Sequence, residues 1–300
     1  MQAAISTNKL TKYYGKTRGI EDLDLEIRRG EVFGYLGPNG AGKSTTIRLL
    51  LDLIRATTGT AEVLGMDSRR DALSIRQRTG YLPGELSLYE NLTGREFLEY
   101  LGRLRGLEGF GEADVVAERL GLDLGRPIGT LSKGNKQKVG LTQAFMHSPE
   151  VLILDEPTSG LDPLVQREFH QLVAETATRG ATVLLSSHVL SEVEQITHRV
   201  GIIRSGRLVV VDDIEHLKQR AVSRIDFRFA RDDVPPDAFQ HLSGVREVDK
   251  HGRLLSVAVE GSVDELTKTA ARYEVLAIKT HEPDLEEVFL AYYKDDADAP

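Results

Sequence analysis

The stretch GPNGAGKST, residues 37–45, limits the possible folds more than any other part of the chain. It matches the pattern GxxxxGK[ST] and stands between the apolar residues 31–37 and the helix-like residues 43–53. Glycines at this spacing let successive backbone N–H groups turn toward one anion, and the helix N-terminus adds unpaired N–H groups. The sequence therefore predicts a phosphate-binding loop. Its members are Gly37, Pro38, Asn39, Gly40, Ala41, Gly42, Lys43, Ser44 and Thr45.

The side chains at the end of this loop indicate which phosphates it holds. Lys43 is expected to reach the β and γ phosphates of a nucleoside triphosphate, and the Ser44 hydroxyl is expected to ligate Mg²⁺. The loop therefore predicts that a nucleoside triphosphate binds together with Mg²⁺.

Continuous apolar runs predict a parallel sheet. EVFGYLG (31–37), VLILDE (151–156) and ATVLLSSH (181–188) lack the alternation of half-exposed strands, as expected for strands buried on both faces. Helix-like stretches follow at 43–53, 163–178 and 190–197. This is an α/β pattern, and ligands in such sheets bind at the carboxyl ends of the strands.

Three polar residues stand at those strand ends. Asp155 closes the run VLILD and is predicted to hold Mg²⁺, and the adjacent Glu156 is predicted to act as general base on the attacking water. His188 ends the run TVLLSSH and is predicted to reach the γ phosphate and the water.

The stretch LSKGNKQKV, residues 131–139, places Ser132, Lys133, Gly134 and Asn135 at the expected start of a helix, with no acidic residue or histidine among them. One interpretation is a surface helix with a serine cap. The other is an anion site, since a helix N-terminus carries unpaired N–H groups and the positive end of the helix dipole. This stretch alone does not decide between them.

The chain is expected to hold two domains. Residues 1–214 form the nucleotide-binding domain, in which about 86–148 reads as an inserted helical subdomain. Residues 215–300 form the second domain, whose pattern from 215 to 294 is βαββαβ with a turn at His251 and Gly252, the ferredoxin-like order, followed by a last helix in PDLEEVFLAYYK. It carries no catalytic-looking cluster, so we expect a regulatory or assembly role, with 295–300 frayed.

Composition excludes several classes of protein. With 38 basic and 46 acidic residues the net charge is −8, which disfavours nucleic acid as a partner. Zero cysteines exclude disulfides and thiolate metal sites. No apolar run approaches the roughly 18 residues needed to span a bilayer, and the N-terminus lacks a signal-peptide pattern. A cytoplasmic location is expected.

Taken together, GPNGAGKST, LSKGN, VLILDEPTSGLDP and His188 resemble the ATP-binding subunit of an ABC transporter, in the family's order and over about residues 1–213. The resemblance implies that LSKGN is the signature sequence, which completes the nucleotide site of a partner subunit. Two such chains, or this chain and a paralogue, would sandwich two ATP molecules, and Ser132 and Gly134 would touch the partner's γ phosphate. It further implies a polytopic membrane permease on another chain and a peripheral position on the inner face of the membrane.

The resemblance assigns two more residues. An aromatic side chain that stacks on adenine is expected in KYYG, where Tyr14 is next to the glycine and Tyr13 is the alternative. SGLDP resembles the D-loop and places Asp162 near the dimer seam.

The chain departs from the family at two places. In LSKGN, Lys133 stands where LSGGQ has a glycine at its third position and Asn135 replaces the glutamine, changes that we expect ATP turnover to tolerate. In GYLPGELSLY, Gly84 holds the place of the glutamine that links the Mg²⁺ site to the membrane subunit, and Glu85 is the candidate substitute. The residue pattern of this loop and of the C-terminal domain resembles the branch of the family that exports drugs and antibiotics.

Three other functions share part of this sequence pattern. A soluble ABC ATPase uncoupled from transport would call for two phosphate-binding loops, a coiled coil or a zinc insertion, and the sequence shows none of these. A GTPase would need a carboxylate where Lys138 stands in NKQK. A nucleotide-gated binding module would form ATP-dependent dimers with negligible turnover.

Overall fold

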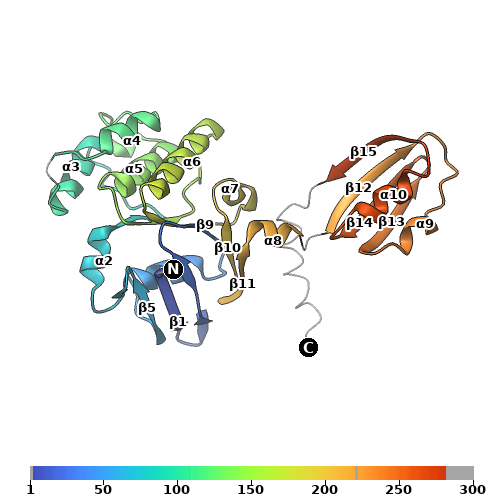
Figure 1. Cartoon of the computed structure of the whole chain (residues 1–300). Helices are drawn as coiled ribbons and strands as arrows, with labels where there is room; N and C mark the ends of the chain where they lie inside the picture. The colour runs from blue at the N-terminus through green and yellow to red at the C-terminus, as the bar shows by residue number, and fades with distance from the viewer. Residues whose placement is uncertain (1–2, 108, 220–221, 282–300) are drawn as a thin grey trace. The chain divides into compact units, whose positions relative to one another are not determined.

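The computed structural model describes residues 3–107, 109–219 and 222–281, and the chain divides into two compact units, Met1–Val211 and Asp212–Pro300. The first unit contains two sheets and a group of helices, and the second contains one sheet (Figure 1).

The six-stranded sheet of the first unit has the strand order β11-β10-β4-β9-β8-β7. Pairing is parallel from β10 through β7. All residues of β8 and β9 are buried, which explains why these strands read as unbroken apolar runs. The strands are β4 (Val32–Leu36), β7 (Thr79–Leu82), β8 (Val151–Asp155), β9 (Thr182–Ser187), β10 (Arg199–Arg204) and β11 (Arg207–Asp213).

This order decides which loops meet. Because β4, β9 and β8 are consecutive neighbours and parallel, the loops that follow their carboxyl ends emerge side by side. Those loops begin with Gly37, His188 and Glu156. The α/β class with a parallel sheet is confirmed.

A helical region separates β7 from β8, and no strand lies in it among the described residues. Thr93 and Glu96 form a reciprocal capping box at the start of α3. In Figure 1, α3, α4 and α5 lie together at one end of the unit, away from β1 and β5. The region contains α3 (Gly94–Leu104), α4 (Ala113–Arg119), η1 (Ile128–Thr130) and α5 (Lys133–Phe145), and the other helices of the unit are α1 (Lys43–Leu50), α2 (Ala72–Arg78), α6 (Pro163–Thr178) and α7 (Leu190–Glu194).

An antiparallel sheet at the N-terminus was not predicted. Its order is β2-β1-β5-β6, with β3 also paired to β1. Its apolar side belongs to the same core as α1 and β4. The strands are β1 (Ala3–Tyr14), β2 (Thr17–Leu23), β3 (Glu26–Arg28), β5 (Thr58–Val63) and β6 (Met66–Asp67).

The second unit has the order β12, α9, β13, β14, α10, β15 along the chain and β13-β14-β12-β15 in the sheet, with antiparallel pairing throughout. This confirms the predicted ferredoxin-like pattern, including the turn at Gly252, where φ is +59°. The predicted helix in 283–294 and the tail 295–300 lie outside the described residues. The elements are α8 (Ile214–Gln219), β12 (Val222–Phe229), α9 (Asp237–Gln240), β13 (Val245–His251), β14 (Leu254–Glu260), α10 (Asp264–Ala270) and β15 (Val275–His281).

Candidate nucleotide-binding site

The phosphate-binding loop connects β4 to α1 as predicted. Gly40 and Gly42 have φ values of +80° and +116°, a region that side chains with a Cβ rarely occupy. Gly42 is the N-cap of α1 and offers no side-chain cap, so the first N–H groups of the helix remain available to a ligand. The loop thus has the backbone conformation that an anion site needs.

Lys43 is held inside this loop. Its side chain is 6% exposed, and its Nζ donates to the carbonyl oxygen of Gly37 at 2.6 Å. The same nitrogen lies 3.2 Å from Oε1 of Glu156. The ammonium group of Lys43 therefore points into the cleft that the loop borders. Its partner there is the carboxylate of Glu156.

Glu156 connects the ends of β8 and β9. Its Oε2 lies 2.7 Å from Nδ1 of His188, and its N–H donates to the carbonyl oxygen of Ser186 at 3.1 Å. The backbone of Glu156 is in the left-handed region, with φ at +51°. The structure therefore brings Lys43, Glu156 and His188 together, although they are far apart in the sequence.

Asp155 lies beside this group at the last position of β8. It is 2% exposed, and the Ser186 hydroxyl donates a short hydrogen bond to its Oδ1. Its Oδ2 faces Gly84, where a Cβ would lie only 3.2 Å away. Ser44, at the second position of α1, lines the same cleft as Asp155.

The cleft formed by these residues has a volume of about 400 Å³. Gly37, Ala41 and His188, which were predicted for this site, are not among its lining residues. Gly37 and Ala41 belong to the loop itself, and His188 contacts Glu156. The cleft is lined by Tyr14, Arg18, Gly19, Pro38, Asn39, Gly40, Gly42, Lys43, Ser44, Thr45, Arg48, Gly84, Glu85, Asp155 and Glu156.

Sequence reasoning missed Arg18 and Arg48, two cations in the wall of the cleft. Arg48 could have been found, because it follows Ser44 by four residues and so lies on the same face of α1. Arg18 gave no comparable signal. It lies on β2, in the sheet that was not predicted.

The structure separates the two tyrosines of KYYG. The Tyr13 hydroxyl donates to Glu21 at 2.8 Å, and this hydrogen bond raises the pKa of Tyr13. Tyr14 is 47% exposed, lines the cleft and packs on Gly19. Of the two rings, Tyr14 is therefore the one that faces the cleft and is open to solvent.

The LSKGN stretch begins α5 but does not line this cleft. Ser132 is the N-cap, and its hydroxyl accepts the N–H of Asn135 at 3.3 Å. A Cβ on Gly134 would lie 2.5 Å from the carbonyl oxygen of Gly160, so the helix start packs on the turn after Glu156. Within the described ranges, Lys133 makes no ion pair.

Asp162 caps α6. Its Oδ1 accepts the N–H groups of Leu164 and Val165, both at 3.1 Å. The carboxylate therefore has a structural task that the sequence analysis did not assign.

Two further cavities lie near Gly84. Gly84 and Glu85 line a groove of about 470 Å³ that also includes Lys133 and Lys136. An apolar groove of about 350 Å³ lies next along the chain, and its lining includes Leu86, Leu88, Tyr89, Phe97 and Leu101.

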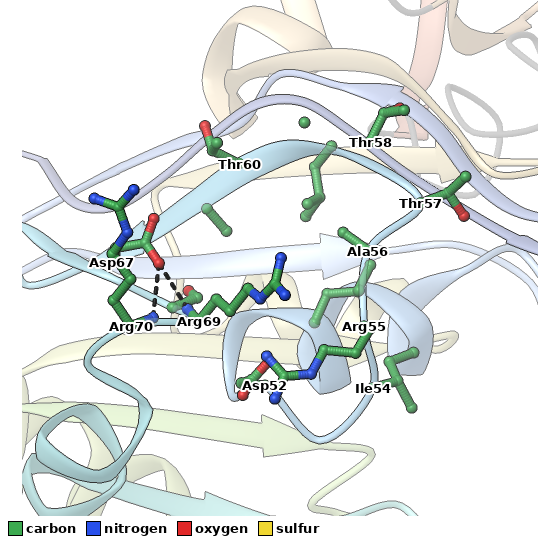
Figure 2. Close-up of a pocket in the computed structure, with 15 residues that line it drawn as sticks. Asp52, Ile54, Arg55, Ala56, Thr57, Thr58, Thr60, Asp67, Arg69 and Arg70 are labelled. Atoms are coloured by element: carbon green, nitrogen blue, oxygen red, sulfur yellow. Dashed lines mark hydrogen bonds and ion pairs between the residues drawn. The ribbon is translucent and has the colours of Figure 1, made fainter.

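Another cavity, of about 680 Å³, lies elsewhere and includes none of the predicted site residues (Figure 2). Arg55, Arg69 and Arg70 are in its lining. Asp67 accepts the backbone N–H groups of Arg69 and Arg70, and Asp52 pairs with Arg55 at 3.0 Å, so the carboxylates in this cavity are already engaged.

The fold and site define a nucleotide-hydrolysing protein with a phosphate-binding loop, and comparison with known proteins identifies its family. The family model described as ABC transporter matches residues 20–159. The chain is 35% identical to the bacitracin transport ATP-binding protein BcrA of Bacillus licheniformis over 97% of each chain. It is 37% identical to the daunorubicin resistance ATP-binding protein DrrA3 of Streptomyces coeruleorubidus, covering 98% of this chain and 96% of that one.

Solved structures agree. The ATP-binding subunit of an ABC transporter is 30% identical, with a TM-score of 0.67 over 72% of this chain and 92% of that chain. The chain belongs to the ABC transporter family as an ATP-binding subunit, and it is an ATPase that powers transport. Among the described residues, no helix is both long and apolar enough to cross a membrane.

Proposed function

We propose that the cleft binds Mg-ATP and that Glu156 is the general base of its hydrolysis. The observation that carries this proposal is that the Glu156 carboxylate contacts two residues from distant parts of the sequence: its Oε1 lies 3.2 Å from Nζ of Lys43, and its Oε2 lies 2.7 Å from Nδ1 of His188. A carboxylate within hydrogen-bond reach of an attacking water takes up its proton as the bond to phosphorus forms. His188, on the other oxygen of Glu156, would orient the carboxylate and is proposed to contact the γ phosphate.

ATP would change the partners of Lys43. In the structure Lys43 neutralises Glu156, and a γ phosphate would draw the ammonium group away because phosphate oxygens carry more charge than one carboxylate. Glu156 would then be free to accept a proton. Binding of the substrate would in this way release the base.

Asp155 and Ser44 fit a Mg²⁺ site. Ser186 occupies one oxygen of Asp155, and the other faces the glycine at position 84, where no side chain intervenes. Oxygen ligands of this kind suit Mg²⁺, which would offset charge on the β and γ phosphates.

Tyr14 is proposed to stack on the adenine ring. Its exposed face adjoins the phosphate-binding loop, and stacking on an aromatic ring tolerates any base, so selectivity for ATP over GTP should be weak.

The LSKGN helix is proposed to complete the ATP site of a second subunit, either a copy of this chain or a paralogue. Its N-terminus carries Ser132 and Lys133 and has no acidic residue in its first turn, so it suits an anion. That anion would not be the one in this chain's own cleft, which α5 does not line. Asp162 would lie near the seam of such a dimer.

A membrane permease on another chain is proposed as the second partner, with this chain on the inner face of the membrane. The apolar groove beside Gly84 is the surface that we propose for the permease. Tyr89 lines this groove, and the groove lies next to the loop in which Gly84 faces Asp155. Gly84 has no side-chain amide of the kind that a glutamine would supply at this position. Glu85, which lines the nucleotide cleft, is the residue proposed to link the two sites.

Export of drugs or other small molecules is the proposed task of the assembly. The support is the naming of full-length relatives for bacitracin transport and daunorubicin resistance. Residues 215–300 are proposed as a regulatory or assembly domain, with the nucleotide-binding domain at 1–214. The part of the ferredoxin-like unit that the structure describes has its own apolar core, which includes Phe227, Phe229 and Phe239.

Transport is tested with the membrane protein that co-purifies with the chain. Vesicles that contain both should take up daunorubicin, followed by its fluorescence, only when Mg-ATP is supplied, and Glu156→Gln should abolish uptake. Bacitracin is the second substrate to test. ATP hydrolysis that is unaffected by the membrane protein would favour the uncoupled ATPase instead.

A further inference from the structure

Gln137 is a buried polar residue on α5, 5% exposed, that makes two hydrogen bonds to the turn after β8. Its Nε2 donates to the carbonyl oxygen of Glu156 at 3.1 Å and to that of Pro157 at 3.0 Å. A primary amide carries two N–H groups, so both bonds form at once. One side chain thus holds two consecutive peptide groups.

The held segment has an unusual conformation. Glu156 has a positive φ, which costs energy in a residue with a Cβ and persists only where the surroundings fix it. Its N–H donates to Ser186 on β9, and its carbonyl accepts from Gln137 and, at 3.3 Å, from the N–H of Ser159. The carbonyl of Pro157 accepts no hydrogen bond other than that of Gln137 among the described residues.

This backbone conformation directs the carboxylate. With φ at +51°, Oε1 of Glu156 lies at Lys43 and Oε2 lies at His188. A change in either of the two peptide groups that follow would tilt the side chain away from the cleft. Gln137 holds both of these peptide groups through its amide.

We propose that Gln137 is a positioning residue for Glu156. It ties the turn that carries the base to α5, whose N-terminus bears Ser132 and Gly134. The helix that would serve the partner's ATP then also fixes the base that acts on this chain's own ATP. The inference rests on the proposed role of Glu156.

The first test is Gln137→Met, which keeps the length of the side chain and removes both N–H groups. We expect kcat for ATP hydrolysis to fall by about 10- to 100-fold, because a small displacement of a catalytic group has effects of this order. KM and the dissociation constant for ATP should stay within about twofold, since Gln137 does not line the nucleotide cleft. Gln171→Met is the matched control, because Gln171 is an exposed residue of α6.

The second test separates positioning from loss of stability. In Gln137→Glu a charged carboxylate would face two carbonyl oxygens, but its protonated form can donate one hydrogen bond. The ratio of its kcat to that of the wild type should therefore rise as the pH is lowered from about 8 to about 6. The same ratio for Gln137→Met should stay flat. Should Gln137→Met fail to fold, as shown by lost ATP binding, the pH dependence of Gln137→Glu decides.

The inference is overturned if folded Gln137→Met hydrolyses ATP within about twofold of the wild type, or if the ratio for Gln137→Glu does not change with pH. Glu156→Gln distinguishes this failure from failure of the proposed function. If Glu156→Gln hydrolyses ATP, Glu156 is not the general base and the proposed function fails. If Glu156→Gln is inactive while Gln137→Met is active, only the positioning role of Gln137 is rejected.

Discussion

Two helices of this protein, α1 and α5, begin with a first turn suited to an anion, and their surroundings differ. At α1, Gly42 leaves the first N–H groups free, and the chain itself supplies Lys43 and, across the cleft, Glu156. At α5, Ser132 caps its own helix, and the first turn has no acidic residue. The difference suggests that the first site is built within the chain, whereas the start of α5 is proposed to form a site only with a second subunit.

Among the tests of the site at α1, Glu156→Gln is expected to have the largest effect. Hydrolysis should fall by about 10²- to 10⁴-fold, because the amide cannot accept the proton of the water. ATP binding should remain, since Lys43 and the loop are intact. Phosphate release and calorimetric binding measure the two effects, and turnover within about threefold of the wild type would remove Glu156 as the base.

Lys43→Ala tests the same helix through binding. ATP affinity should fall by on the order of 100-fold, because the variant loses a charge-assisted contact to the β and γ phosphates. Calorimetry with Mg-ATP gives the affinity. Wild-type affinity in the variant would contradict the phosphate-binding role of the loop.

Tyr14→Ala should have a smaller effect. Loss of one stacking contact is expected to weaken ATP binding by about tenfold, within the usual range of about 1–3 kcal/mol per base. Tyr14→Phe is the matched control and should bind like the wild type. Equal affinity of the alanine and phenylalanine variants would show that the ring does not stack on the base.

The smallest expected effect concerns His147, a half-buried residue just after the C-terminal end of α5. Burial lowers the pKa of His147 to about 4, and the positive charge of Arg105 adds to this shift. Since the unfolded chain protonates this histidine near pH 6.5 and the folded chain near 4, the free energy of unfolding should fall as the pH drops between these values. We expect a contribution on the order of 1 kcal/mol, because solvent reaches part of the ring.

Chemical unfolding of wild type and His147→Gln at pH 7 and pH 4.5 measures this contribution. The variant should lose less stability than the wild type over that interval. Equal losses would show that His147 is not responsible.

The parallel sheet and the phosphate-binding loop could be predicted because the physics is local. A strand buried on both faces must be apolar throughout, and the loop needs glycines at fixed positions. The antiparallel sheet was not predicted because apolar and polar residues do not alternate regularly along β1. Its register shifts between Leu10 and Lys12, and Lys9 has a φ of +44°, so the apolar side changes along the strand.

The sequence indicated several residues that line the cleft but not Arg18 or Arg48, and it did not indicate the geometry of the cleft. Strand ends indicated Asp155, Glu156 and His188, but nothing in the sequence indicated the left-handed backbone of Glu156, which tertiary hydrogen bonds maintain. Gln137 had a signal that was missed. It lies three, four and seven residues before Gly140, Leu141 and Ala144, so it is a polar residue on the buried stripe of α5.

The central claim is that α5 completes a site on a second subunit, and mixing two inactive variants tests it most directly. Ser132→Arg should bind ATP as a monomer but neither dimerise nor hydrolyse, and Lys43→Ala should bind ATP too weakly to hydrolyse it. A mixed dimer pairs one intact loop with one intact α5 start, so part of the ATPase activity should return on mixing. If α5 is only a capped surface helix, Ser132→Arg should instead cost about 0.5–2 kcal/mol of stability and little activity. Full activity of Ser132→Arg alone as a monomer would contradict the shared site.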